Sequence, residues 1–379
     1  MEIIYIQEDG FKCVIGCLDI DEPREFFFSL DSSLDDVEDF LRISGKDTVV
    51  LDSSYSSIRD HLGMSSSELF RSLPSDRRKD MCRRAVKSLS EAAISGASKV
   101  YLTSYKEQKE FLRKLKNPVY SDHKLKVLSE EIPHESTRRR VLDLLEDTQK
   151  TEYSMSGTVT GRLVVKKGPN ILTLPSKVRS CIRSSYRRGK ILQLDLTAAE
   201  PFLALLRSGK MPPKDIYSHI SEEVLEGKVS RSDAKIITLS ALYGQSSSNL
   251  SKKLPDSVNA RDVISKTKRY FDFERLAREL SRDLKNRNFR NVLGRPLFLD
   301  DPRESLLISY YLQSSIAECS ILLFSDFYRR FENSMKPYYV IHDALIFDAE
   351  EKFATKLLEK ESIALSLGEW KFRAKVSEV

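Results

Sequence analysis

Two apolar runs near the C-terminal end, separated by only two polar residues, constrain the fold of this chain most strongly. In YYVIHDALIFDAEE, residues 338–341 and 344–347 flank His342 and Asp343. Runs of β-forming residues joined by so short a break are typical of a hairpin. We therefore expect a hairpin with an acid at its tip. Turn chemistry alone could explain Asp343, and a histidine beside it is more often a structural hydrogen-bonding residue.

A second acid follows an apolar strand in the middle of the chain. In GKILQLDLTAAEPFLALL, the run Ile191–Leu194 leads to Asp195 and then, through Thr197 and Glu200, into a helical segment. Considered alone, this pattern favours a helix N-cap as much as a site.

Asp195 and Asp343 together indicate more than either residue does alone. The ions of a two-metal phosphoryl-transfer site need hard oxygen ligands on a rigid support, and two strands provide such a support. The pair therefore predicts a site for two Mg²⁺ ions.

The segment RSDAKIITLSALYG is expected to form a helix from about Arg231. Four of its residues recur at intervals of four and share one stripe: Arg231, Lys235, Leu239 and Tyr243. Two cations ahead of an aromatic ring suit a triphosphate and a base pair, whereas an ordinary amphipathic helix would place apolar residues there. The chance of Arg-x3-Lys-x7-Tyr-Gly arising from this composition is on the order of a few in a thousand.

Composition sets the broad class of the protein. The chain has 379 residues, of which 40% are hydrophobic and 31% charged, so it can bury a sizeable core. The net charge of +6 permits binding to nucleic acid without requiring it. No run of roughly 20 apolar residues is visible, so we expect no membrane association.

Five scattered cysteines favour reduced thiols over a disulfide framework. Cys13 and Cys17 have no second Cys or His pair at zinc-ligand spacing, so a structural role is favoured. The N-terminus resembles neither a signal peptide nor a transit peptide, and we expect a cytoplasmic protein, in the host cytoplasm if the source is viral.

The N-terminal 150 residues divide into two parts. Residues 1–52 are expected to form three strands, a helix and a further strand, which is an α/β unit. Residues 65–150 are largely helical, including STRRRVLDLLEDTQKTEY, and are interrupted by the strand-like SKVYLTS at 98–104.

The segments around Asp195, Arg231 and Asp343 resemble, in order and content, motifs A, B and C of the family A DNA polymerases, the family of bacterial DNA polymerase I. They are DLTAAE, RSDAKIITLSALYG and VIHDAL. A fourth match precedes them, because SGTVTGRLVVKKGPNILTLP resembles the TGRL…PNLQNIP stretch of that family, and RSCIRSSY resembles the arginine-rich segment that follows it. The resemblance covers about residues 151–379.

The resemblance implies an α+β fold shaped as a polymerase right hand, with a small α/β RNase H-like remnant at the N-terminus. It implies a vestigial exonuclease-like domain at 1–95, a reduced thumb at 96–160, palm at 161–207 and 301–379, and fingers at 208–300. IIYIQED does not present the Asp-x-Glu motif of the exonuclease family, and LDSSYSSIRDHLG does not match the family's second motif, although it contains Asp52 and Asp60. We therefore expect an inactive exonuclease remnant. A small thumb predicts poor processivity, and hence an accessory replisome protein or a gap-filling role in repair.

The resemblance also implies the role of each site residue. Asp195 and Asp343 would hold two Mg²⁺ ions, with help from the backbone carbonyl of Leu196. Arg231 and Lys235 would hold the triphosphate of a dNTP, Leu239 and Tyr243 would line the nucleotide site, and Glu200 would exclude a 2′-hydroxyl. His342 would lie near the primer end. The residues expected to contact primer-template DNA are Arg162, Gln313, Lys166, Lys167, Arg179 and Arg183.

Three residues depart from the pattern of the family. Leu239 stands where the family usually has Phe or Tyr, Ala344 where Glu usually follows His-Asp, and Tyr217 where a His often helps to hold the phosphates. The change at Leu239 affects sugar discrimination and the turnover rate, and the change at Tyr217 affects nucleotide binding.

The leading hypothesis is a template-directed DNA polymerase without proofreading. A related RNA polymerase or reverse transcriptase is a close alternative, and Glu200 argues against RNA products. A catalytically silent protein that only binds primer-template DNA is an alternative from a different class.

Overall fold

The computed structural model describes residues 99–379 except 147–148, 156, 287, 298 and 300–301, together with the short segments 2–7, 12–17, 61–63, 74 and 77. The chain divides into two compact units, Met1–Lys106 with Gly294–Phe298 and Glu107–Leu293 with Leu299–Val379.

The first unit contains a β-hairpin. Strands β1 (Glu2–Gln7) and β2 (Lys12–Cys17) pair antiparallel, and these two expected strands are confirmed. The remaining elements predicted for the first 52 residues, and Asp52 and Asp60, lie outside the described residues.

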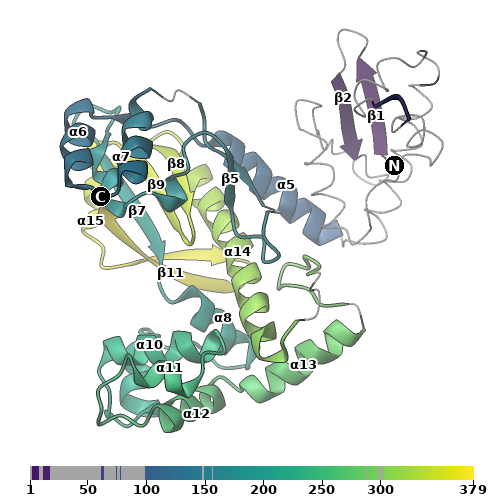
Figure 1. The fold of residues 1–379 in the computed structure, drawn as a ribbon, viewed down its shortest axis with the longest axis vertical. Helices are drawn as coiled ribbons and strands as arrows, with labels where there is room; N and C mark the ends of the chain where they lie inside the picture. The colour runs from purple at the N-terminus through teal and green to yellow at the C-terminus, as the bar shows by residue number, and fades with distance from the viewer. Residues whose placement is uncertain are drawn as a thin grey trace. The chain divides into compact units, whose positions relative to one another are not determined.

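A five-stranded antiparallel sheet is the centre of the second unit (Figure 1). Its order is β10-β11-β7-β9-β8, with the bounds Ile363–Leu367, Trp370–Glu378, Lys190–Leu196, Ala344–Ala349 and Met335–Ile341. The predicted strand before Asp195 is β7, and the predicted hairpin is β8 and β9, so both expectations are confirmed. Two short antiparallel pairs complete the described strands of this unit: β3 (Val119–Tyr120) with β6 (Ile182–Arg183), and β4 (Glu152–Ser154) with β5 (Val164–Lys167).

One face of the sheet packs against α14 (Leu307–Phe331) and α15 (Glu351–Leu358). The ring of Phe347 on β9 lies edge-on to Phe327 of α14, with 5.9 Å between the centroids, and Phe327 also contacts Phe353 of α15. All six residues of β9 are buried, which explains why all of them except Asp348 are apolar. The buried Asp348 carboxylate accepts hydrogen bonds from the hydroxyls of Ser184, Ser185 and Tyr338.

The other face of the sheet packs against α6 (Asp122–Glu131) and α7 (Glu135–Leu142). Leu125 and Val141 of these helices share a buried cluster with Ile191 of β7 and Ile346 of β9. Because side chains alternate along a strand, Asp195 lies on the same face as Ile191, four residues further along β7.

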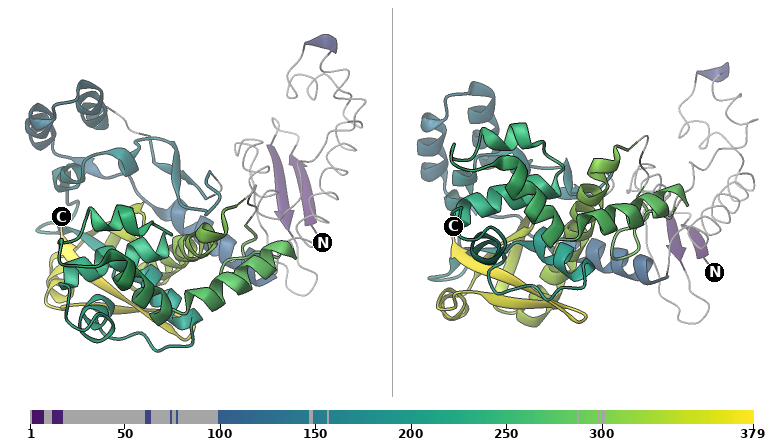
Figure 2. Two further views of the ribbon diagram at one scale, coloured as in Figure 1. Left: turned by 60° about the horizontal axis from the view of Figure 1, so that its bottom comes forward. Right: turned by 90° about the horizontal axis from the view of Figure 1, so that it is seen from below.

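The helices between β7 and α14 begin with α8 (Ala199–Arg207). They continue with α9 (Ile216–His219), the π-helix η4 (Ile220–Val224), α10 (Arg231–Leu242), α11 (Ser247–Ser251), α12 (Ala260–Tyr270) and α13 (Phe273–Lys285). Figures 1 and 2 show α10, α11 and α12, in green, as one helical group. A capping box between Ser230 and Asp233 starts α10 at the predicted residue.

The strand-like interpretation of residues 98–104 is wrong. Residues 99–104 begin α5 (Lys99–Lys114), in which Tyr101, Tyr105, Gln108 and Leu112 are buried at helical spacing. The helical spacing of buried residues over the whole segment outweighs the β propensity of the few residues at its start.

The helix predicted to continue beyond residue 142 ends earlier than expected. After α7 the chain forms the 3-10 turn η1 (Asp143–Leu145), and residues 152–154 form β4 instead of helix. The other 3-10 turns are η2 (Ile171–Thr173), η3 (Ser176–Cys181) and η5 (Glu304–Leu306).

Helix α14, with the turn before it, is long and apolar enough by composition to cross a bilayer, contrary to the expectation that no such segment exists. Its most apolar window is 78% buried inside the protein, which is typical of a core helix.

The sheet core gives the first testable prediction. Phe347→Ala is expected to lower the free energy of unfolding by about 3–5 kcal/mol, because it leaves a cavity against Phe327. Urea denaturation measures the change. Met211→Ala is the control, since Met211 is 88% exposed, and should stay within about 0.5 kcal/mol of the wild type. A loss below about 1 kcal/mol at Phe347 would contradict the packing described.

Candidate active site

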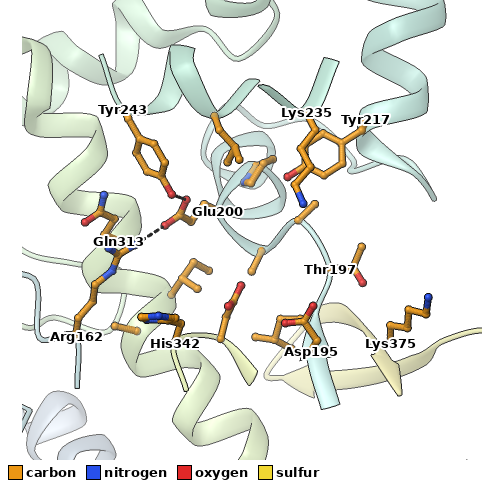
Figure 3. Close-up of a pocket in the computed structure, with 18 of the residues that line it drawn as sticks. Arg162, Asp195, Thr197, Glu200, Tyr217, Lys235, Tyr243, Gln313, His342 and Lys375 are labelled. Carbon is orange, nitrogen blue, oxygen red and sulfur yellow. Dashed lines mark hydrogen bonds and ion pairs between the residues drawn. The ribbon is translucent and has the colours of Figure 1, made fainter. Parts of the chain in front are cut away.

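A cleft of about 730 Å³ opens where β7 and the β8–β9 turn meet α8, α10 and α14 (Figure 3). It brings together most of the residues singled out from the sequence. Those that line it are Arg162, Asp195, Leu196, Glu200, Tyr217, Arg231, Lys235, Leu239, Tyr243, Gln313, His342 and Asp343.

Backbone pairing brings the two predicted acids into one cleft. Asp195 is the penultimate residue of β7 and lies opposite Ala344, the first residue of β9. Asp343 occupies the two-residue turn just before Ala344, and the N–H of Leu196 donates to its carbonyl oxygen at 3.1 Å. Both carboxylates are therefore carried by hydrogen-bonded backbone.

The acidic pair disfavours its own ionisation. Burial and the nearby charge of Asp343 raise the pKa of Asp195 to about 6, against the opposing charges of Lys235 and Arg179. Burial also raises the pKa of Asp343. Burial and mutual repulsion both favour the neutral acids, and a cation bound between them would favour the ionised carboxylates instead.

The oxygen donors at this position fit Mg²⁺, which commonly binds one or two carboxylates and completes its shell with waters and phosphate oxygens. No cluster of three or more His, Cys, Asp or Glu side chains suited to a metal occurs within the described residues. Asp195 and Asp343 are thus the donor pair to consider.

The N-cap interpretation of Asp195 and Thr197 is wrong. The N-cap of α8 is Ala198, which has a left-handed backbone (φ 51°, ψ 41°) and makes no side-chain cap bond. The hairpin turn likewise takes its left-handed residue at His342 (φ 54°) instead of at Asp343. Asp195 therefore has no role as the N-cap of α8, whereas Asp343 does occupy the hairpin turn, as its sequence position predicted.

The predicted stripe on α10 faces the cleft. All four of its members line the cleft, and Arg231 at its start donates from Nε to Asp215 Oδ2 at 2.8 Å. The ring of Tyr217 lies near both cations, with its centroid 5.7 Å from Arg231 Cζ and 6.0 Å from Lys235 Nζ. Tyr217, which stands where the family often has His, therefore places a buried ring beside the two cations.

Glu200 of α8 connects three parts of the cleft wall. Tyr243, the residue that ends α10, donates from its hydroxyl to Glu200 Oε2 at 2.5 Å, and Arg162 Nη2 lies 3.4 Å from Oε1 (Figure 3). Burial raises the pKa of Glu200, while the bond from Tyr243 and the charge of Arg162 oppose the rise. The carboxylate is consequently held in place from two sides.

Two further predicted residues lie at the same end of the cleft as Arg162. Gln313 of α14 donates to Ser309 Oγ at 2.9 Å, and His342 is exposed in the hairpin turn (Figure 3).

Four residues predicted to bind DNA do not line the cleft. Lys166 and Lys167 lie on β5, and the ammonium of Lys167 is 4.0 Å from Glu152. Arg179 donates to Gln193 at 2.9 Å and acts on Asp195 through its charge alone, while Arg183 is exposed on β6.

Two polar residues that the sequence patterns did not single out as site residues, Thr197 and Lys375, also line the cleft. The alternation of apolar and polar residues in WKFRAKVSE is a sequence signal for a strand. Its pairing with β7, which brings Lys375 opposite Asp195, joins residues distant in sequence and has no local signal.

The acidic pair predicts a pH-dependent cost to stability when divalent cations are withheld. The folded pKa of Asp195 is above its usual value, so the ionised form disfavours folding above about pH 6, and this penalty disappears as the pH falls towards 4. Asp195→Asn is expected to raise the free energy of unfolding at pH 8 by about 1–2 kcal/mol, after allowance for solvent screening. The gain should vanish at pH 4.

Urea denaturation across pH 4–8 measures this difference, with the exposed Asp256→Asn as the control. An equal gain at both ends of the pH range, or a loss at pH 8, would contradict the electrostatic account.

Gly244 holds the end of α10 that carries Tyr243. Its φ is +64°, and a Cβ there would lie 2.6 Å from the Ser305 carbonyl oxygen, whereas Gly209, at φ +72°, has nothing within 4 Å. Gly244→Ala is expected to lower the free energy of unfolding by at least about 2 kcal/mol, and Gly209→Ala by about 1 kcal/mol. Equal losses for the two variants in urea denaturation would contradict the close approach.

No protein-family model matches this chain, and no curated protein matches it. Among solved structures, the chain is similar to "POL domain of Pol1 from M. smegmatis complex with DNA primer-template and dNTP". The TM-score is 0.55 at 14% identity, over 90% of this chain and 80% of that one. At this identity the likeness shows the fold: a mixed α+β chain that resembles a polymerase domain.

Proposed function

We propose that this protein is a template-directed DNA polymerase that adds deoxynucleotides to a primer 3′ end and belongs, as a short form, to family A. The observation that carries the proposal is the acidic pair, Asp195 and Asp343, facing the cationic stripe of α10 across one cleft. The polymerase-like fold supports it.

Asp195 and Asp343 would hold two Mg²⁺ ions, with the Leu196 carbonyl as a further ligand. Bound there, the ions would activate the primer hydroxyl and neutralise charge on the leaving phosphates. Ala344 offers no ligand in the position where the family usually has Glu, so the metal site depends on these two aspartates.

The nucleotide would occupy the cleft between α8 and α10. Arg231 and Lys235 would bind its triphosphate through charge-assisted hydrogen bonds, and the ring of Tyr243 would pack against the new base pair. Glu200, held by Tyr243 and Arg162, would fill the space that a 2′-hydroxyl needs. Leu239 would leave more room beside the sugar than the ring usual in the family.

Primer-template DNA would lie at the end of the cleft that carries Arg162, Gln313 and His342. The first two would contact the minor groove, and His342 would contact the primer end. The four basic residues outside the cleft would contact the backbone of the duplex: Lys166, Lys167, Arg179 and Arg183.

The domain assignment follows the same proposal. Residues 161–207 and 301–379 would form the palm, 208–300 the fingers and 96–160 a reduced thumb. Residues 1–95 would be a vestigial exonuclease-like domain without proofreading activity. We further propose a cytoplasmic protein that works with an accessory processivity protein or fills gaps.

Primer extension tests the proposal. With Mg²⁺, a DNA primer-template and dNTPs, the wild type is expected to extend the primer. Asp343→Asn should slow extension by at least about 100-fold while its affinity for primer-template stays within about twofold, because a metal ligand is lost and the DNA contacts are kept.

The control variant is Asp256→Asn, which removes a carboxylate that does not line the cleft and should extend normally. Tight DNA binding by the wild type without extension would favour the binding-protein alternative, and extension with rNTPs alone would favour an RNA polymerase.

A further inference from the structure

We propose that Lys375 binds the polyphosphate tail of the incoming nucleotide, and the pyrophosphate that leaves, from the sheet side of the cleft. This inference rests on the proposed polymerase function and adds a residue from β11, outside the segments that suggested that function.

The backbone at Lys375 is fixed beside the acidic pair. Strand β11 pairs antiparallel with β7, and Lys375 lies directly opposite Asp195. Where the chain leaves β7, the N–H of Thr197 donates to the Arg373 carbonyl oxygen at 2.8 Å. A side chain on this strand therefore starts from a rigid position next to the reacting centre.

The ammonium of Lys375 is available for a ligand. Lys375 is exposed and lines the cleft, and its ammonium makes no hydrogen bond or ion pair within the described part of the chain. In Figure 3 its side chain lies beside Thr197, at the side of Asp195 away from Arg162.

Charge pairing in the cleft distinguishes Lys375 from most of its neighbours. Arg162 is paired with Glu200 and Arg231 with Asp215.

Among the described lysines and arginines that line the cleft, Lys235 and Lys375 are the two without an ion-pair partner. One comes from α10 and the other from the sheet, so they can approach a polyanion from two walls. A triphosphate tail carries several negative charges and suits such an arrangement.

The position of Lys375 favours the phosphate tail over the DNA backbone. Of the residues proposed to contact the duplex, the three that line the cleft, Arg162, Gln313 and His342, lie together at its other end (Figure 3).

In the proposed reaction the primer 3′-oxygen forms a bond to the α-phosphorus and loses its proton to solvent. The bond from the α-phosphorus to the bridging oxygen breaks, and pyrophosphate leaves with that electron pair. Lys375 would donate hydrogen bonds to phosphate oxygens before and after this step and would form no covalent bond.

Single-nucleotide incorporation by the full chain tests the inference. For Lys375→Ala, we expect the KM for each of the four dNTPs and the inhibition constant of inorganic pyrophosphate to rise about tenfold, because one charge-assisted contact to the shared tail is lost. The affinity for primer-template, measured by fluorescence anisotropy, should change less than about twofold. Lys375→Arg should restore most of the loss.

Lys371→Ala is the matched control. Lys371 is exposed on the same strand and the same face, roughly 13 Å from Lys375 along β11, and does not line the cleft. It should behave as the wild type.

Unchanged KM and unchanged pyrophosphate inhibition in Lys375→Ala would overturn the inference and leave the proposed function standing. Weaker primer-template binding at unchanged KM would assign Lys375 to the DNA backbone, which also overturns it. A wild type that extends no primer would instead overturn the proposed function, and this inference with it.

Discussion

The site depends on the antiparallel pairing of β7 with β9. This register places Asp195 opposite Ala344, and the bond from Leu196 to the Asp343 carbonyl closes the end of the ladder. Two half-buried carboxylates brought together in this way resist ionisation, so the strands hold them against an electrostatic cost. Binding of divalent cations would remove that cost, which explains why two acids could be kept close together in the cleft. The apolar packing on both faces of the sheet provides the stability that offsets it.

The cationic wall of the cleft is connected to the sheet through Glu200. Its carboxylate joins α8 to Tyr243 at the end of α10 and to Arg162 in the segment before β5. A displacement of α10 would therefore strain or break a hydrogen bond within the cleft. The position of α10 and the position of the Glu200 carboxylate are therefore coupled through one hydrogen bond.

Local patterns in the sequence were sufficient where the structure is local. The two-residue break at His342 and Asp343 predicted the β8–β9 hairpin, and four-residue spacing predicted the stripe on α10, whose members all line the cleft. Prediction failed at residues 98–104, where a long helix overrode a few β-forming residues. It also missed Lys375, because strand pairing across distant parts of the chain has no local signal. The family resemblance identified Glu200 and Tyr243 as site residues, but only the structure revealed the hydrogen bond between them.

In the proposed reaction, Asp195 and Asp343 would act as one metal-holding unit in nucleotide addition. A double-mutant cycle on the single-turnover rate of primer extension tests it most directly, with Asp195→Asn, Asp343→Asn and the double variant compared at saturating Mg²⁺ and dNTP. Groups that act as a unit are non-additive, so the account predicts that the double variant is no slower than the slower single variant. Losses that add in free energy, or a single variant with the wild-type rate, would contradict it.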